Sequence, residues 1–182
     1  MDTDEDSSDS CNYKFITKEL SKYKKSILIK FYDNKSYIGY IKGTFINNKN
    51  ITSYLSMPDI YKVFETSDKE EEEELEDFYF SVLSNRKNTR YSFYITEFFI
   101  DKEFRGNGLG SKILNMIPNI IRSNIIEYVE EVYLMPGQLE EVNGEVKYIK
   151  DHNNPNLKKL IQFYKSMGFE IVDKTEYLVE EI

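Results

Sequence analysis

The chain has 182 residues, of which 40% are hydrophobic and 31% are charged, so it can bury the core of one α/β domain but is too short for two. Its formal net charge of −8 repels phosphate polymers, and we therefore expect no nucleic-acid partner. No segment approaches the roughly 18 apolar residues of a membrane span, and the acidic N-terminus differs from a secretory signal. A cytoplasmic protein that does not bind membranes is expected.

Residues 1–11 are predicted to form an acidic, disordered tail, and residues 12–182 a single domain. The tail begins with acidic and small polar side chains, which cannot bury enough apolar surface to offset the entropy of ordering. No internal repeat or interdomain linker interrupts the rest of the chain. Cys11 is the only cysteine, so no internal disulfide can form, and a reducing compartment is compatible.

Two β-rich segments near the N-terminus predict a hairpin. Residues Ile27–Tyr32 and Tyr37–Ile46 flank a turn-prone stretch of Asp, Asn, Lys and Ser. A third, short strand is expected at Ile51–Leu55. Pro58 suits the first turn of a following helix over Asp59–Phe64.

An acidic segment after residue 66 predicts an amphipathic helix. Ser67 and Glu70 have the spacing of a capping box. Apolar residues then recur on one helical face: Leu75, Phe78, Tyr79, Val82 and Leu83. The carboxylates of Glu70–Glu74 complement the helix dipole, which favours a solvated face. A surface for basic partners over Glu70–Asp77 is an alternative that the sequence leaves open.

A buried strand, a glycine-rich loop and a helix follow one another in the middle of the chain. The strand is predicted at Tyr91–Ile100, which is rich in Tyr, Phe and Ile. In the loop Arg105–Gly110, Gly108 and Gly110 lack the side chains that would keep a phosphate from backbone N–H groups at a helix start. The loop therefore predicts a pyrophosphate ligand. A Walker loop would need Gly-Lys-Ser/Thr, and a dinucleotide loop would need glycine where Ser111 stands.

The helix after this loop has apolar residues at helical spacing, and Pro118 is a point where it could kink. Later elements are a strand at Glu131–Met135, a hairpin turn at Asn143-Gly144, a helix at Asn156–Met167, and terminal strands at Phe169–Asp173 and Tyr177–Glu181. This mixed order predicts an α/β (α+β) fold with one twisted, mixed sheet flanked by helices.

Three motifs, taken in their order along the chain, resemble the GNAT superfamily of N-acetyltransferases. Arg-x-x-Gly-x-Gly at Arg105–Gly110 is similar to the acetyl-CoA signature of that superfamily. The segment Tyr94–Ile100 is similar to its fourth strand, and Phe163–Phe169 to its later helix-to-strand signature. The resemblance covers residues 91–173.

The resemblance implies a GNAT-like sheet whose central strands splay apart near Ile100 and Met135, with acetyl-CoA as co-substrate in the gap. The pantetheine arm would pair with the strand backbone at Phe98, Phe99 and Ile100. The pyrophosphate would lie on the loop and helix start, formed by Arg105, Gly106, Asn107, Gly108, Leu109, Gly110 and Ser111. The implied reaction is acetyl transfer to a primary amine by direct attack in a ternary complex.

Two side chains are candidates for the proton transfers that this reaction needs. Tyr164 matches the tyrosine of the superfamily's helix signature, which implies a general acid for the leaving thiolate. Glu97 lies in the splayed strand and is a candidate base for the amine, or equally a structural carboxylate. His152 is the only histidine, so a multi-histidine metal site is excluded and no metal is expected.

The sequence does not identify the acceptor. A small-molecule amine, a lysine side chain and a protein N-terminus all fit, and the acidic chain favours a cationic acceptor. The alternative function is a noncatalytic acyl-CoA-binding module of the same fold. The oligomeric state also stays open, with a homodimer among the states allowed.

Overall fold

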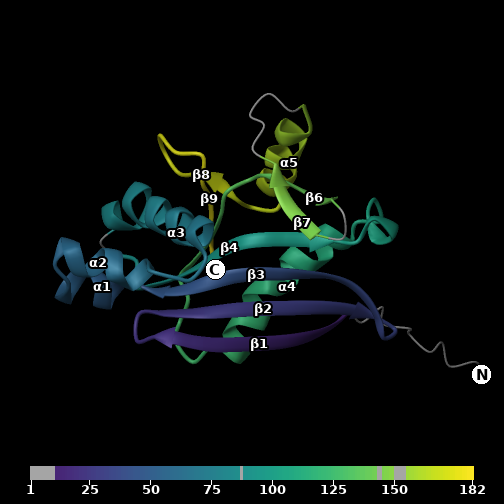
Figure 1. The fold of residues 1–182 in the computed structure, drawn as a ribbon. Coiled ribbons are helices and arrows are strands. Elements are labelled where there is room, and N and C mark those ends of the chain that lie inside the picture. Colours follow the sequence, from purple (N-terminus) through teal and green to yellow (C-terminus); the bar gives the residue numbers. More distant parts are fainter. Residues whose placement is uncertain (1–10, 87, 143–144, 150–154) are drawn as a thin grey trace, which may run out of the picture.

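A computed structural model describes residues 11–86, 88–142, 145–149 and 155–182, without the side chains of 138–149. A mixed, seven-stranded sheet lies between two layers of helices (Figure 1), which confirms the predicted fold class. The acidic tail predicted for residues 1–11 falls outside the described residues except for Cys11, which is half-buried against the core. The predicted Asn143-Gly144 turn also lies outside them.

The sheet has the spatial order β1-β2-β3-β4-β5-β9-β8. Its strands are β1 (Asn12–Ser21), β2 (Lys24–Asp33), β3 (Ser36–Asn47), β4 (Tyr91–Ile100), β5 (Glu131–Leu134), β9 (Leu178–Glu181) and β8 (Glu170–Ile171). All neighbours are antiparallel except β4 and β5, which are parallel. Strands β6 (Gln138–Val142) and β7 (Glu145–Ile149) form a separate two-stranded sheet.

The predicted hairpin is confirmed as β2 and β3, but the strand β1 was not predicted. This edge strand pairs with β2 along almost its whole length, and most of its side chains are exposed. An exposed strand needs no regular alternation of apolar residues, so its sequence resembles a polar loop.

The helices between β3 and β4 pack on one face of the sheet, mainly over β4, β5 and β9, and the later helices pack on the other face (Figure 1). The first group is α1 (Asn48–Tyr54), α2 (Met57–Phe64) and α3 (Lys69–Ser81), followed by the 3-10 turn η1 (Leu83–Asn85). The second group is α4 (Leu109–Asn124), preceded by the 3-10 turn η2 (Lys102–Phe104), and α5 (Pro155–Ser166). None of the helices in the described ranges is long and apolar enough to cross a membrane.

The strand predicted at Ile51–Leu55 is wrong, because these residues belong to α1 and its C-terminal cap. Asn47 caps the helix by accepting a hydrogen bond from the Asn50 N–H. The buried Asn48 amide donates to the Thr89 carbonyl at 3.1 Å, which anchors the helix start beside β4. These side chain-to-backbone bonds outweigh the weak strand preference of a short apolar run.

The helix predicted after residue 66 is confirmed as α3, but its N-cap is Asp68 and not Ser67. The Asp68 carboxylate accepts hydrogen bonds from the N–H groups of Glu70 and Glu71 at 3.0 and 3.3 Å. We expect Asp68→Ala to lower the free energy of unfolding by about 1 kcal/mol, and Ser67→Ala to leave it unchanged, in urea denaturation. Equal losses in both variants would contradict the assignment of the cap.

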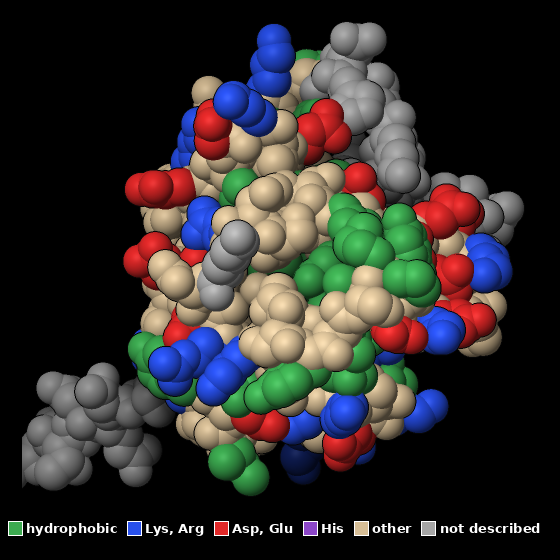
Figure 2. Space-filling view, turned by 90° about the vertical axis from the view of Figure 1, so that its left-hand side faces the viewer, with side chains coloured by type: hydrophobic (Ala, Val, Ile, Leu, Met, Phe, Trp, Pro, Cys, Tyr) green, Lys and Arg blue, Asp and Glu red, His purple; other side chains and the backbone are tan. Residues whose placement is uncertain are grey.

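The end of the molecule that carries α1 and α2 exposes large hydrophobic side chains (Figure 2). Tyr54, Met57 and Tyr61 are the most exposed of them on these two helices. The Tyr61 ring also packs against Phe80 of α3, with ring centroids 5.1 Å apart. This end therefore leaves large apolar side chains in contact with solvent.

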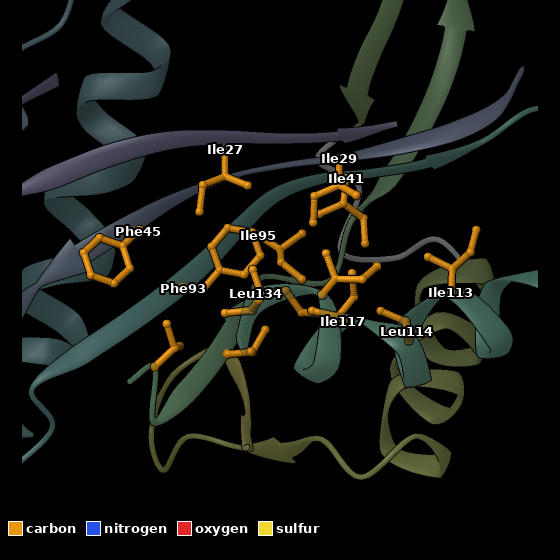
Figure 3. Close-up of a cluster of buried hydrophobic side chains, with 14 of the residues drawn as sticks. Ile27, Ile29, Ile41, Phe45, Phe93, Ile95, Ile113, Leu114, Ile117 and Leu134 are labelled. Atoms are coloured by element: carbon orange, nitrogen blue, oxygen red, sulfur yellow. The ribbon is translucent and has the colours of Figure 1, made fainter. Parts of the chain in front are cut away.

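Two buried clusters hold the layers together, one on each face of the sheet. The cluster on the α4 face joins strand residues such as Ile29, Ile41 and Phe93 to Ile113 and Ile117 of α4 (Figure 3). The cluster on the opposite face is more aromatic. Its rings include Phe64, Phe78, Tyr79, Tyr94, Tyr133 and Tyr177. Burial of a large apolar side chain stabilises the fold by about 1.5–3 kcal/mol, so these clusters fix the position of α3 and α4 on the sheet.

Candidate active site

The two parallel strands at the centre of the sheet separate where β5 ends. Their pairing begins at Ser92 and Glu131 and stops at Ile95 and Leu134, whereas β4 continues to Ile100. The backbone groups of residues 96–100 that face the β5 side have no ladder partner among the described strands. β4 and β5 therefore separate after Ile95 and Leu134, as expected from the sequence. The extended backbone of β4 beyond this point is available to a ligand.

A β-bulge in this part of β4 decides where Glu97 points. Lys42 of β3 pairs with Glu97, and the adjacent Gly43 pairs with Ile95, so Thr96 is an extra residue without a partner position. Ile95 points into the cluster on the α4 face, and strict alternation would send Glu97 to that same face. The extra residue turns Glu97 to the opposite face.

Two side chains of β3 hold the Glu97 carboxylate on that face. The Tyr40 hydroxyl donates to Oε2 at 2.5 Å, and the Lys42 ammonium lies 3.3 Å from Oε1. Burial, and next the Glu97 carboxylate, raise the pKa of Tyr40 well above its ordinary value. Burial disfavours the charge of Lys42, but the carboxylates around it, Glu97 foremost, outweigh this and raise its pKa. Tyr40 therefore stays a hydrogen-bond donor and Lys42 stays charged.

The glycine-rich loop after β4 adopts the conformation that its glycines permit. Gly106 has φ 88° and Gly108 has φ 73°, both in the left-handed region. Gly108 occupies the N-cap position of α4 but has no side chain that could accept a hydrogen bond. The N–H groups of Leu109, Gly110 and Ser111 in the first turn therefore have no side-chain cap. A Cβ at Gly106 or Gly108 would meet nothing within 4 Å. The loop therefore offers open space over N–H groups at a helix N-terminus, which suits an anion.

The remaining loop residues connect the start of α4 to the splayed strand. The Arg105 Nε donates to the Ile100 carbonyl at 2.6 Å, and its guanidinium lies over the Phe99 ring at 5.3 Å. A Cβ at Gly110 would lie 3.4 Å from Phe163 and 3.5 Å from Ile100, which are ordinary packing distances, so the start of α4 lies next to both α5 and the end of β4. Asn107 lies exposed between Gly106 and Gly108. The loop and the end of β4 thus form one continuous surface.

Tyr164 lies near the C-terminal end of α5, with its ring buried in the cluster on the α4 face. The ring packs against Phe163 and Phe169, with centroids 5.3 and 5.8 Å apart. Phe98 and Ile100 of the splayed segment pack against the same cluster. Tyr164 and Glu97 therefore lie on opposite faces of the sheet, on either side of the gap, and do not form one contiguous pair.

Sequence reasoning missed Tyr40 and Lys42. Both lie in the segment Tyr37–Ile46, which was predicted as a strand, and alternation with the apolar Ile41 could have placed them on the face opposite to it. Their contact with Glu97 depends on the β3–β4 register, which no local motif encodes. His152 lies outside the described residues. Within the described ranges no group of three potential metal-ligating side chains occurs.

Three comparisons relate this geometry to known proteins. A family model described as "Acetyltransferase (GNAT) domain" matches residues 70–171. No curated protein matches the sequence significantly. The match to the family model spans the α3 helix, the splayed strand, the glycine-rich loop and α5, that is, most of the elements that form the site.

Solved structures share the fold at low sequence identity. An agmatine N-acetyltransferase is 9% identical with a TM-score of 0.52, over 85% of this chain and 76% of that chain. A mosquito arylalkylamine N-acetyltransferase is 11% identical with a TM-score of 0.51, over 85% and 74%. A polyamine N-acetyltransferase from Drosophila melanogaster is 9% identical with a TM-score of 0.50, over 85% and 74%.

Proposed function

This chain belongs to the GNAT acetyltransferase family, and we propose that it transfers the acetyl group of acetyl-CoA to a primary amine. The observation that carries the proposal is the open cradle of N–H groups at the start of α4, next to a stretch of β4 without a strand partner. A pyrophosphate fits the first and an extended pantetheine arm fits the second. The three similar structures are named as acetyltransferases of amines, and we extend an amine acceptor to this chain.

In the proposed reaction the amine attacks the thioester carbonyl directly. A C–N bond forms, the C–S bond breaks, and no covalent enzyme intermediate is required. A backbone N–H of the splayed segment, residues 98–100, would stabilise the negative charge that develops on the carbonyl oxygen. Tyr164 would donate a proton to the leaving thiolate. Glu97 would accept the proton that the amine loses, while Tyr40 and Lys42 hold its carboxylate in place.

We expect Glu97→Gln to lower kcat/KM about a hundredfold for an alkyl amine. Such an amine has a pKa near 10.4, so less than about 0.1% of it is neutral at pH 7, whereas roughly a tenth of an α-amine with a pKa of about 8 is neutral. The loss should therefore be clearly smaller with the α-amine acceptor in the same steady-state assay. An equal loss with both acceptors would contradict the role of a base.

A matched control for this variant is Glu127→Gln. Glu127 is also a part-buried carboxylate that pairs with a lysine, Lys25, at 2.7 Å, but it lies at the far end of α4 from the glycine-rich loop. The control should keep full activity. A comparable loss of activity in both variants would indicate a general effect of breaking an ion pair on the fold.

The proposal as a whole is tested by thiol release from acetyl-CoA with a panel of amines, peptides and a blank without acceptor. Calorimetry with CoA on the same preparation measures binding independently of turnover. Turnover with an amine class supports the proposal. Binding without turnover would favour a noncatalytic acyl-CoA-binding module, and absence of binding would overturn both.

A further inference from the structure

In the proposed reaction the two substrates would approach the gap from opposite faces of the sheet. The glycine-rich loop begins α4, so the co-substrate reaches the gap from the α4 face. The bulge at Thr96 turns Glu97 to the other face, where the acceptor amine must then approach. On that face α3 lies to one side of the site, because Phe78 stacks on Tyr94 of β4 at 4.2 Å. An acceptor larger than a small amine would therefore extend away from α3, over β3, β2 and β1.

This part of the sheet is open, since no helix covers the front of β1, β2 and β3 (Figure 1). Its side chains follow from the strand register. Lys14 pairs with Lys30, and Lys30 pairs with Tyr40, whose hydroxyl holds Glu97. In the next cross-strand row Ile16 pairs with Leu28, and Leu28 pairs with Lys42. We call the surface formed by Lys14, Ile16, Lys18, Leu28 and Lys30 the lysine face.

The lysine face is positively charged although the chain carries a net charge of −8. Within the described residues Lys14, Lys18 and Lys30 form no ion pair. Acidic side chains gather instead on the α3 side of Glu97, where Asp68 and Glu71 act on Lys42. The acceptor surface is thus acidic where an ammonium group would enter and basic farther along the sheet.

An edge strand often carries lysines simply to prevent association with other strands. That explanation covers Lys14 and Lys18 of β1, but Lys30 lies on β2, inside the sheet and between two paired strands. Leu28 and Ile16 beside it supply apolar contact area, which a purely solvating surface does not need. The combination of separated charges and apolar side chains fits a peptide better than a single small cation.

We propose that the acceptor is a protein or peptide whose acetylated amine is followed by acidic side chains that bind the lysine face. Neighbouring strands are about 4.8 Å apart, so β2 and β1 lie roughly 10 and 14 Å from β4. An extended peptide rises about 3.3 Å per residue and reaches these strands after about three to four residues. This inference rests on the proposed acetyltransferase function and specifies its substrate class.

The test compares peptides that differ only at the third and fourth residues after the amine, with Glu-Glu, Gln-Gln or Lys-Lys there. We expect kcat/KM to be about fivefold higher for Glu-Glu than for Gln-Gln, the size expected of two exposed ion pairs, and to fall with added salt. The double variant Lys14→Gln/Lys30→Gln should remove this preference through KM. Lys30→Glu should shift the preference toward Lys-Lys.

The control is Lys49→Gln/Lys174→Gln, which changes the net charge equally at two exposed lysines outside the lysine face. It should keep the preference for Glu-Glu. Equal rates for the three peptides, or turnover of small amines alone, would overturn the inference while leaving the proposed function intact. Competition by a short RNA but not by an acidic peptide would overturn it in favour of a nucleic-acid surface. Loss of CoA binding and of all turnover would instead refute the proposed function.

Discussion

Gly108→Ala is expected to weaken CoA binding about a hundredfold while lowering the free energy of unfolding by roughly 1–2 kcal/mol. The added Cβ would meet no protein atom within 4 Å, and it would stand on the residue directly before the first N–H groups of α4, where we propose that the pyrophosphate binds. Hydrogen bonds to a charged group contribute about 1.5–3 kcal/mol each, and losing one or two of them accounts for the expected factor. Calorimetry with CoA measures the effect.

The strain of the left-handed backbone must be separated from the loss of the ligand site. Alanine at φ 73° costs roughly 1–2 kcal/mol, with or without a ligand. Gly168 has φ 99° at the end of α5, away from the loop, and a Cβ there would come no closer than 3.6 Å to Glu180. Gly168→Ala should therefore lose similar stability in thermal unfolding and keep its affinity for CoA. Retained CoA affinity in Gly108→Ala would refute the anion site.

Tyr164→Phe is expected to lower kcat by about a thousandfold, within the range found for general acids. Phenylalanine keeps the ring that packs against Phe163 and Phe169, so the core around α5 should be preserved. Only the hydroxyl that we propose as proton donor is removed. CoA binding should stay unchanged in calorimetry, and thiol release should show the loss.

Tyr79→Phe is the matched control for this variant. Tyr79 is a buried tyrosine of α3 whose ring packs on Phe64 at 5.2 Å, on the face of the sheet away from Tyr164. Burial raises the pKa of its hydroxyl. Tyr79 therefore stands for a buried tyrosine to which we assign no role in proton transfer. The control should retain activity. Full activity in Tyr164→Phe as well would show that Tyr164 only packs in the core and is not the proton donor.

Much of the site could be predicted because its signals are local. Gly106 and Gly108 occupy left-handed positions that other residues adopt only with strain, so the loop is encoded residue by residue. The strand Tyr91–Ile100 was predicted with the bounds that β4 has, because its Tyr, Phe and Ile residues suit a strand buried on both faces. The order of strand, loop and helix was therefore available without tertiary information.

Local signals failed where two short-range preferences compete. The apolar residues of Ile51–Leu55 suit a strand, but the cap at Asn47 and the bond from Asn48 to the Thr89 carbonyl favour a helix. The spacing of Ser67 suits a capping box, but the adjacent Asp68 makes the bonds. In the first place the sequence predicted a regular element, and the hydrogen bonds decided that it is a helix. In the second place it predicted a helix start, and the hydrogen bonds decided which residue is the N-cap.

Local sequence signals are enough to predict the fold class and the glycine-rich loop of this member of the GNAT acetyltransferase family. The side chains around Glu97, and the face of the sheet on which it lies, depend instead on how the strands pair. A strand's period of two places side chains relative to its own backbone, but one extra residue at Thr96 reverses that placement. Lys42 and Tyr40 come from a strand more than fifty residues away in sequence, and their contact with Glu97 arises from the pairing of whole strands, which no single segment encodes.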